Sequence, residues 1–193
     1  LYPMGSAVLV CAVYIVVQYA GEHREKKRLE GIFGKYVSKE VAASIVRGGE
    51  EALKLGGQKK DVAVLFVDIR NFTPLSESLP PEKVVEVLNH CMKLTTRAVF
   101  ANEGTVDKFI GDATMAIYNA PLALEDYVFK AVKTGLDMAE AAKGLEEELM
   151  ELAGRKVSFG VGINCGEAVI GNIGTSSRMD YTAIGNTVNI AAR

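Results

Sequence analysis

Two aspartates lie where the sequence predicts that strands end or turn. Asp68 follows the apolar run DVAVLFV, and Asp112 lies in the turn of a predicted hairpin. If these strands are neighbours, both carboxylates converge on one edge of a sheet and repel each other. A divalent cation removes that repulsion, and hard oxygen ligands favour magnesium or manganese. Two ions about 3.5–4 Å apart would activate an attacking hydroxyl and hold a leaving phosphate, although each aspartate taken singly fits an ordinary cap or turn residue at least as well.

Further polar candidates lie next to these aspartates in the chain. The backbone amides of segment 69–73 (IRNFT) would cradle phosphates at the start of a helix or turn. Lys108 precedes Asp112 by four residues, a spacing that keeps to one face of a strand. Because a turn intervenes, the two side chains need not point the same way, and an ordinary solvated lysine remains an alternative.

Asn189 and Arg193 lie four residues apart on a predicted helix, and therefore on one face of it. The rest of that helix is small or apolar. A planar guanidinium on such a surface suits a phosphate that gains charge during a reaction. The alternative is a helix that simply ends in a basic residue.

The elements that must position these residues alternate between strands and helices. A continuous valine-rich run predicts a buried strand, a proline pair predicts the start of a helix, and a Gly-Asp pair predicts a tight turn. The order predicts an α+β fold, an α/β sandwich with helices packed on a sheet. The expected elements are a strand over 61–68, a helix from 80 to 104, a hairpin over 105–118, a helix over 124–152, strands over 157–163 and 168–173 around a turn at Gly166, a strand over 181–184 and a helix over 186–193.

The N-terminal part has a different character. Residues 1–20 carry no charge, and about 20 apolar residues of helix span the ~30 Å hydrocarbon core. Basic residues cluster at 23–28, which places the downstream chain in the cytoplasm by the positive-inside rule. We therefore expect a transmembrane helix in the inner membrane, with a buried core helix or a signal peptide as alternatives. Residues 21–56 predict a helical linker or dimer connector. Because the chain starts without methionine and stops within an apolar run, we expect a fragment of a longer protein.

Composition excludes some classes of function. The chain of 193 residues is 49% hydrophobic, enough for a folded core. Its formal net charge of −2 argues against a nucleic-acid partner, which would require a basic surface. The three cysteines show no CxxC or Cys/His ligand spacing, so neither a disulfide framework nor a zinc site is expected.

Four longer motifs resemble the class III adenylyl/guanylyl cyclase family. They are FVDIRNFT (66–73), DKFIGDATMAIY (107–118), VGINCGEAVIGNIG (161–174) and RMDYTAIGNTVNIAAR (178–193). The segment FGKYVSKEVA (33–42) is similar to the lead-in of bacterial members. The resemblance implies a catalytic domain over 57–193, incomplete at its C-terminus, with a ferredoxin-like, palm-type βαββαβ core. It also implies a homodimer with active sites at the interface.

The resemblance implies metal and phosphate ligands at the end of the first strand. Asp68 and Asp112, assisted by the Ile69 carbonyl, would bind two Mg²⁺ or Mn²⁺ ions. Phe72 and Thr73 would belong to the substrate-binding segment that follows.

The resemblance also implies residues that read the nucleotide. Lys108 and Thr182 would recognise adenine, since a lysine donor suits the adenine N1 acceptor, and guanylyl cyclases typically carry glutamate and cysteine there. Asn189 would orient the ribose. Arg193 would stabilise negative charge on the α-phosphate. A monomer would be inactive, because the metal ligands come from one protomer and the base-reading residues and Arg193 come from the other.

The implied activity is that of an adenylate cyclase, which converts ATP to cyclic AMP and pyrophosphate in a signalling receptor. A guanylate cyclase and a catalytically silent cyclase-like module that only dimerises are alternatives. A diguanylate cyclase would need a Gly-Gly-Asp/Glu-Glu-Phe turn, which the sequence IGDA at 110–113 lacks. Family members carry a further phosphate-contacting lysine beyond the position of Arg193. Threonine at 182 is similar to a subgroup described as responsive to bicarbonate.

Overall fold

The chain divides into two compact units, Leu1–Ala42 and Ala43–Arg193. In the first unit, the Gln18 side-chain amide donates a hydrogen bond to the Tyr14 hydroxyl at 3.1 Å. None of the helices built from described residues is both long and apolar enough to cross a bilayer. The membrane span expected over 1–20 and the connector expected over 21–56 lie largely outside the described part of the chain, and both stay predictions. The computed structural model describes residues 54–144 and 146–193 together with Tyr14, Gln18, Val41, Ala42, Gly48 and Gly49.

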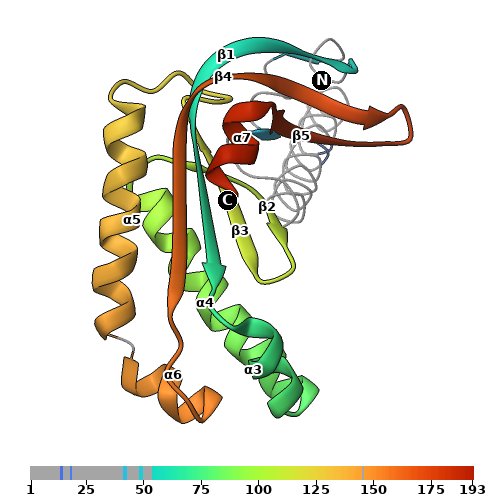
Figure 1. The fold of residues 1–193 in the computed structure, drawn as a ribbon. Helices are drawn as coiled ribbons and strands as arrows, with labels where there is room; N and C mark the ends of the chain where they lie inside the picture. The colour runs from blue at the N-terminus through green and yellow to red at the C-terminus, as the bar shows by residue number, and fades with distance from the viewer. Residues whose placement is uncertain (1–13, 15–17, 19–40, 43–47, 50–53, 145) are drawn as a thin grey trace, which may run out of the picture. The chain divides into compact units, whose positions relative to one another are not determined.

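The second unit is built on one antiparallel sheet with strand order β2-β3-β1-β4-β5 (Figure 1). Helices connect β1 to β2 and β3 to β4, which gives the first four strands the expected βαββαβ arrangement. The strands are β1 (Gly56–Ile69), β2 (Thr105–Ile110), β3 (Ala113–Tyr118), β4 (Phe159–Thr175) and β5 (Arg178–Ile184). The helices are α3 (Phe72–Ser78), α4 (Pro81–Ala101), α5 (Tyr127–Gly144), α6 (Glu146–Ala153) and α7 (Asn186–Ala191).

The central strand β1 is buried on both faces along its apolar run from Val62 to Val67, where only Phe66 is partly exposed. Leu65 and Val67 belong to a core cluster shared with α4 and α5. The alternate residues Val62 and Val64 belong to a second cluster that includes Ala191 of α7. Because side chains alternate between the faces of a strand, burial on both faces makes the run continuously apolar. Asp68 follows in the series of Val62 and Val64 and therefore faces the α7 side.

The hairpin over 105–118 and the helix that begins at the proline pair are confirmed, but two other predictions are wrong. The strands expected over 157–163 and 168–173 form the single strand β4, which pairs with the full length of β1. Gly166 lies inside this strand opposite Val62, with φ 144°, a conformation that glycine tolerates. The helix expected over 124–152 is divided into α5 and α6.

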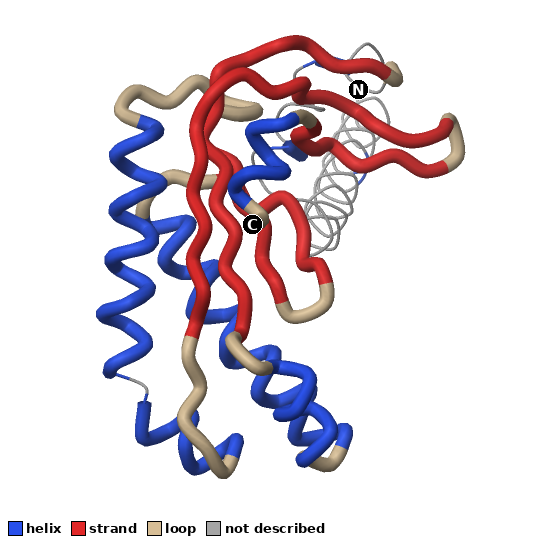
Figure 2. The backbone as a smooth tube through the Cα atoms, viewed as in Figure 1, coloured by secondary structure: helices blue, strands red, loops and turns tan. Residues whose placement is uncertain are grey.

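Strands β1 and β4 run side by side and curve together, as the tube in Figure 2 shows. The curvature carries the β4–β5 hairpin back over the sheet. As a result β5, at one edge of the strand order, makes side-chain contacts with β2 at the other edge: Lys108 contacts Asp180, and Thr182 contacts Asp107.

Candidate active site

The predicted carboxylate pair lies at the end of β1. The β1–β3 pairing ends with Val67 opposite Thr114, so Asp68 comes next on β1, while Asp112 lies in the turn before β3, two residues from Thr114. The pKa of Asp68 is raised, chiefly by partial burial and then by the negative charge of Asp112, while Arg70 opposes the shift. Asp112 is thus close enough to destabilise the charged form of Asp68, as expected for two carboxylates at one site.

The backbone next to this pair offers a further oxygen. The Arg70 N–H donates to the Ser158 carbonyl at 2.8 Å, so the hydrogen-bonding groups of Arg70 face β4. Neighbouring residues of a strand direct these groups to opposite sides, and the Ile69 carbonyl is therefore directed toward the β3 side, where Asp112 lies. Two carboxylates and a carbonyl are hard oxygen donors, and the repulsion between the carboxylates is relieved by a cation, so this donor set fits Mg²⁺ or Mn²⁺. Among the described residues, no group of three or more His, Cys, Asp or Glu is placed to hold a metal ion.

Helix α3 starts directly after this site. Asn71 precedes it in the left-handed conformation, with φ 57° and ψ 39°, and its side chain does not cap the helix. The first amides of a helix have no partner within the helix. Phe72 and Thr73 are the first two residues of α3, so their N–H groups are available to an anion.

The predicted purine-reading residues meet at a polar cluster between β2 and β5. The Thr182 hydroxyl donates a hydrogen bond to Asp107 Oδ2. Lys108 Nζ lies 3.6 Å from Asp107 Oδ1 and 3.2 Å from Asp180 Oδ2. The structure therefore brings Lys108 and Thr182 to the same carboxylate, that of Asp107, and their role in reading the purine stays a prediction.

Asp107 occupies this position because β2 is irregular there. The β2–β3 register shifts between Val106 and Lys108, so that Asp107 is the additional residue of a β-bulge. A bulge re-aims side chains beside it, and here the consecutive residues Asp107 and Lys108 both contact the β5 side. The Asp107 side chain is only 1% exposed. Burial raises its pKa, whereas Thr182, Lys108 and the Ala183 backbone amide favour the charged form.

Asn189 and Arg193 belong to the region of α7, and both are exposed. The helix ends at Ala191, so Arg193 lies just beyond it, with its N–H donating to the Ile190 carbonyl at 3.2 Å. Helix α7 lies close against β4, because a Cβ added at Gly162 would be 2.1 Å from the Ala191 carbonyl oxygen. The helix expected over 186–193 therefore ends two residues early, so only Asn189 of the pair lies on α7, and the roles of both side chains stay predictions.

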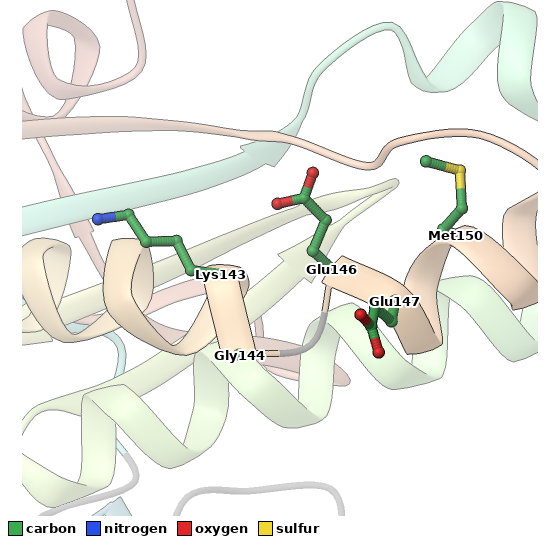
Figure 3. Close-up of a pocket in the computed structure, with 5 residues that line it drawn as sticks. All are labelled: Lys143, Gly144, Glu146, Glu147 and Met150. Carbon is green, nitrogen blue, oxygen red and sulfur yellow. The ribbon is translucent and has the colours of Figure 1, made fainter.

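A separate hollow of about 540 Å³ lies beside the junction of α5 and α6 (Figure 3). None of the predicted site residues lines it. Two of its charged groups are in ion pairs, since Glu146 pairs with Lys156 at 2.6 Å and Lys143 with Glu140 at 3.9 Å. The hollow is lined by Lys143, Gly144, Glu146, Glu147 and Met150.

The sheet order and the carboxylate pair at the end of β1 place the chain among the class III nucleotidyl cyclases. The family model described as the adenylate and guanylate cyclase catalytic domain matches residues 56–193. The chain belongs to this family. Cyclase domains of the family act as dimers, bind nucleotide and use divalent metal ions.

Solved structures of both substrate classes resemble the chain. The guanylyl cyclase Cya2 is 35% identical, with a TM-score of 0.68 over 72% of this chain and 70% of that one. The adenylyl cyclase CyaB from P. aeruginosa is 36% identical, with a TM-score of 0.68 over 72% of each chain. A relative named uncharacterized protein Rv1318c, from Mycobacterium tuberculosis, is 38% identical over 88% of this chain. The chain spans only 29% of that relative's length.

Proposed function

We propose that this domain is an adenylate cyclase that converts ATP to 3′,5′-cyclic AMP and pyrophosphate in a homodimer. The observation that carries the proposal is the cluster of Lys108, Asp107 and Thr182, in which a lysine and a hydroxyl are held side by side. The Lys108 ammonium offers only donors and suits the N1 acceptor of adenine. Guanine presents a donor at N1, which the ammonium would repel.

The carboxylate pair would bind the metal ions that act on the phosphates and the ribose of the nucleotide. Asp68, Asp112 and the Ile69 carbonyl would hold two Mg²⁺ or Mn²⁺ ions under the phosphates. When bound, such ions lower the pKa of the ribose 3′-hydroxyl and offset charge on the phosphates. The amides of Phe72 and Thr73 would donate hydrogen bonds to phosphate oxygens.

Asn189 on α7 and Arg193 just beyond its end complete the proposed site. Asn189 would accept or donate a hydrogen bond at the ribose and so fix the 3′-hydroxyl in line with the α-phosphorus. Arg193 would donate to the α-phosphate oxygens as negative charge develops there, and removing such a donor lowers the rate by about a hundredfold or more.

The test measures cyclic nucleotide formation from ATP and from GTP by the full-length protein in the presence of Mn²⁺. We expect cyclic AMP to be the main product, and Asp68→Ala to abolish it. Lys108→Glu combined with Thr182→Cys should shift the preference toward GTP. Preferential formation of cyclic GMP would support the second candidate, a guanylate cyclase, the class to which the similar Cya2 belongs. Absence of any cyclic nucleotide would support a silent dimerisation module.

We also propose that residues 1–20 anchor the protein in the inner membrane, with the catalytic domain on the cytoplasmic side. The support is the uncharged apolar stretch and the basic cluster that follows it. Fractionation of cells expressing the full-length protein tests this. Deleting residues 1–20 should move the protein from the membrane to the soluble fraction, and an unchanged distribution would contradict the proposal.

A further inference from the structure

We propose that Asp107 is a specificity-determining residue, because it fixes the Thr182 hydroxyl as a hydrogen-bond acceptor toward the purine base. The inference rests on the proposed function and adds the physical basis of its base preference. It concerns the C6 position of the purine, where adenine carries an amino group and guanine an oxo group.

The hydrogen bond between Thr182 and Asp107 runs from the hydroxyl to the carboxylate. An ionised carboxylate has no hydrogen to donate, so the threonine hydroxyl must be the donor. Burial raises the pKa of Asp107, but the Thr182 hydroxyl, the Lys108 ammonium and the Ala183 backbone amide oppose this shift and favour the ionised form. The hydroxyl of Thr182 is the donor to Asp107 Oδ2 in the structure. Thr182 is itself only 7% exposed, which leaves few water molecules to compete for its hydrogen.

The bond to Asp107 leaves the Thr182 hydroxyl with acceptor capacity only. A threonine hydroxyl has one hydrogen and two lone pairs. With the hydrogen committed to Asp107, only lone pairs can be offered to a ligand. These lone pairs accept a hydrogen bond from a 6-amino group, whereas a 6-oxo group would face them with lone pairs of its own. A site with a fixed acceptor therefore rejects the 6-oxo purine, since neither oxygen finds a donor.

The β-bulge in β2 places Asp107 beside Thr182. In a regular strand, residues 107 and 108 would point to opposite faces. The extra residue lets both contact β5. One oxygen of Asp107 then faces the Thr182 hydroxyl while the other lies 3.6 Å from the Lys108 ammonium. The same carboxylate therefore contacts both predicted base-reading groups, through a hydrogen bond from Thr182 and an ion pair with Lys108.

The variant Asp107→Asn reverses the polarity of the contact. The asparagine carbonyl is expected to turn toward the Lys108 ammonium, because an NH₂ group facing that cation would be repelled. Its NH₂ group then donates to Thr182, whose hydrogen becomes free to donate to a 6-oxo group. We expect the ratio of kcat/KM for ATP to kcat/KM for inosine triphosphate to fall by about tenfold or more. Inosine triphosphate has the 6-oxo group without the 2-amino group of guanine.

Asp180→Asn is the matched control. Asp180 also contacts Lys108, at 3.2 Å, but lies on the exposed surface. If Asp107 acts only through charge near Lys108, both variants should change the ratio alike. The proposal requires a much larger change for Asp107→Asn, and requires that change to vanish when Thr182 is replaced by valine. An unchanged ratio in Asp107→Asn, or equal changes in both variants, would overturn it.

A second measurement does not depend on the folding of Asp107 variants. If the Thr182 hydroxyl is fixed as an acceptor, Thr182→Val removes a repulsion and should raise kcat/KM for inosine triphosphate. If the hydroxyl rotates freely, the same substitution removes a donor and should lower it, which would contradict the proposal. If the wild-type protein cyclises ATP and Thr182→Val lowers kcat/KM for inosine triphosphate, the role of Asp107 is overturned and the proposed function stays intact. If the wild-type protein forms no cyclic nucleotide, both the role of Asp107 and the proposed function are overturned.

Discussion

At the scale of single residues, the coupling between Asp68 and Asp112 has consequences that can be measured. The negative charge of Asp112 raises the pKa of Asp68, so Asp112→Asn should lower that pKa and keep Asp68 ionised to more acidic pH. The variant also removes an oxygen donor, and we expect Mn²⁺ affinity to fall by at least about tenfold. NMR titration of the Asp68 carboxyl and calorimetric Mn²⁺ titration test the two effects.

The control for this prediction is Asp61→Asn, at an exposed position of the same strand. It should leave both the Asp68 pKa and the Mn²⁺ affinity unchanged. An Asp68 pKa that rises or stays constant in Asp112→Asn would show that the two carboxylates do not interact.

Two described cysteines should differ sharply in reactivity. Cys91 is buried in α4, and burial raises its pKa to about 11, whereas Cys165 is exposed. Because the thiolate is the reactive form, iodoacetamide at pH 8 should modify Cys165 in the folded protein and Cys91 only after unfolding. Peptide mass spectrometry separates the two sites. Rapid modification of Cys91 under native conditions would show that α4 does not pack as described.

The sequence predicts the site residues unevenly, for physical reasons. Asp68 and Asp112 are predictable because each terminates a local pattern, an apolar strand and a tight turn. The importance of Asp107 is not predictable in this way, since it depends on a bulge in β2 and on contact with Thr182, 75 residues away. A charged residue inside a predicted strand was the one available signal, and it does not reveal which partner it meets.

At the scale of elements, the contact between α7 and β4 depends on a missing side chain. A Cβ at Gly162 would lie 2.1 Å from the Ala191 carbonyl oxygen, so Gly162→Ala must displace α7 or the strand. We expect the free energy of unfolding to fall by about 1–3 kcal/mol, as for other overpacked sites, and activity to fall with it because α7 carries Asn189. Chemical denaturation and a cyclase assay measure the two quantities.

Gly144→Ala provides the comparison, because Gly144 ends α5 with no atom within 4 Å of the added Cβ. That substitution should be neutral or stabilising by up to about 1 kcal/mol. Equal stability of the two variants would mean that α7 does not depend on Gly162.

The same strand shows why element boundaries were partly mispredicted. Glycine at position 166 is equally compatible with a turn and with a bend inside a strand, because its freedom at positive φ serves both. Only pairing along the whole of β1 distinguishes the two, and pairing between distant segments is not visible in a local pattern. The helix α4 and the hairpin of β2 and β3 were predictable because proline and Gly-Asp signals act locally.

At the scale of the whole molecule, the curved sheet divides the proposed site into two halves. One half, with Asp68 and Asp112, lies at the end of β1. The other, with the Asp107 cluster, lies where the β4–β5 hairpin meets β2. The side chain of Asn189 is exposed and so is accessible to a second chain. A two-fold dimer would join opposite halves at two equivalent sites.

Mixing two inactive variants tests this arrangement. Asp68→Ala and Asn189→Ala should each abolish activity alone. If each site takes Asp68 from one chain and Asn189 from its partner, a heterodimer of the two variants has one site with both substitutions and one intact site. Random exchange of equal amounts should then restore about a quarter of wild-type activity, because half of the dimers carry one of two equivalent sites. If each site belonged to a single chain, no heterodimer would contain an intact site, and the mixture would stay inactive.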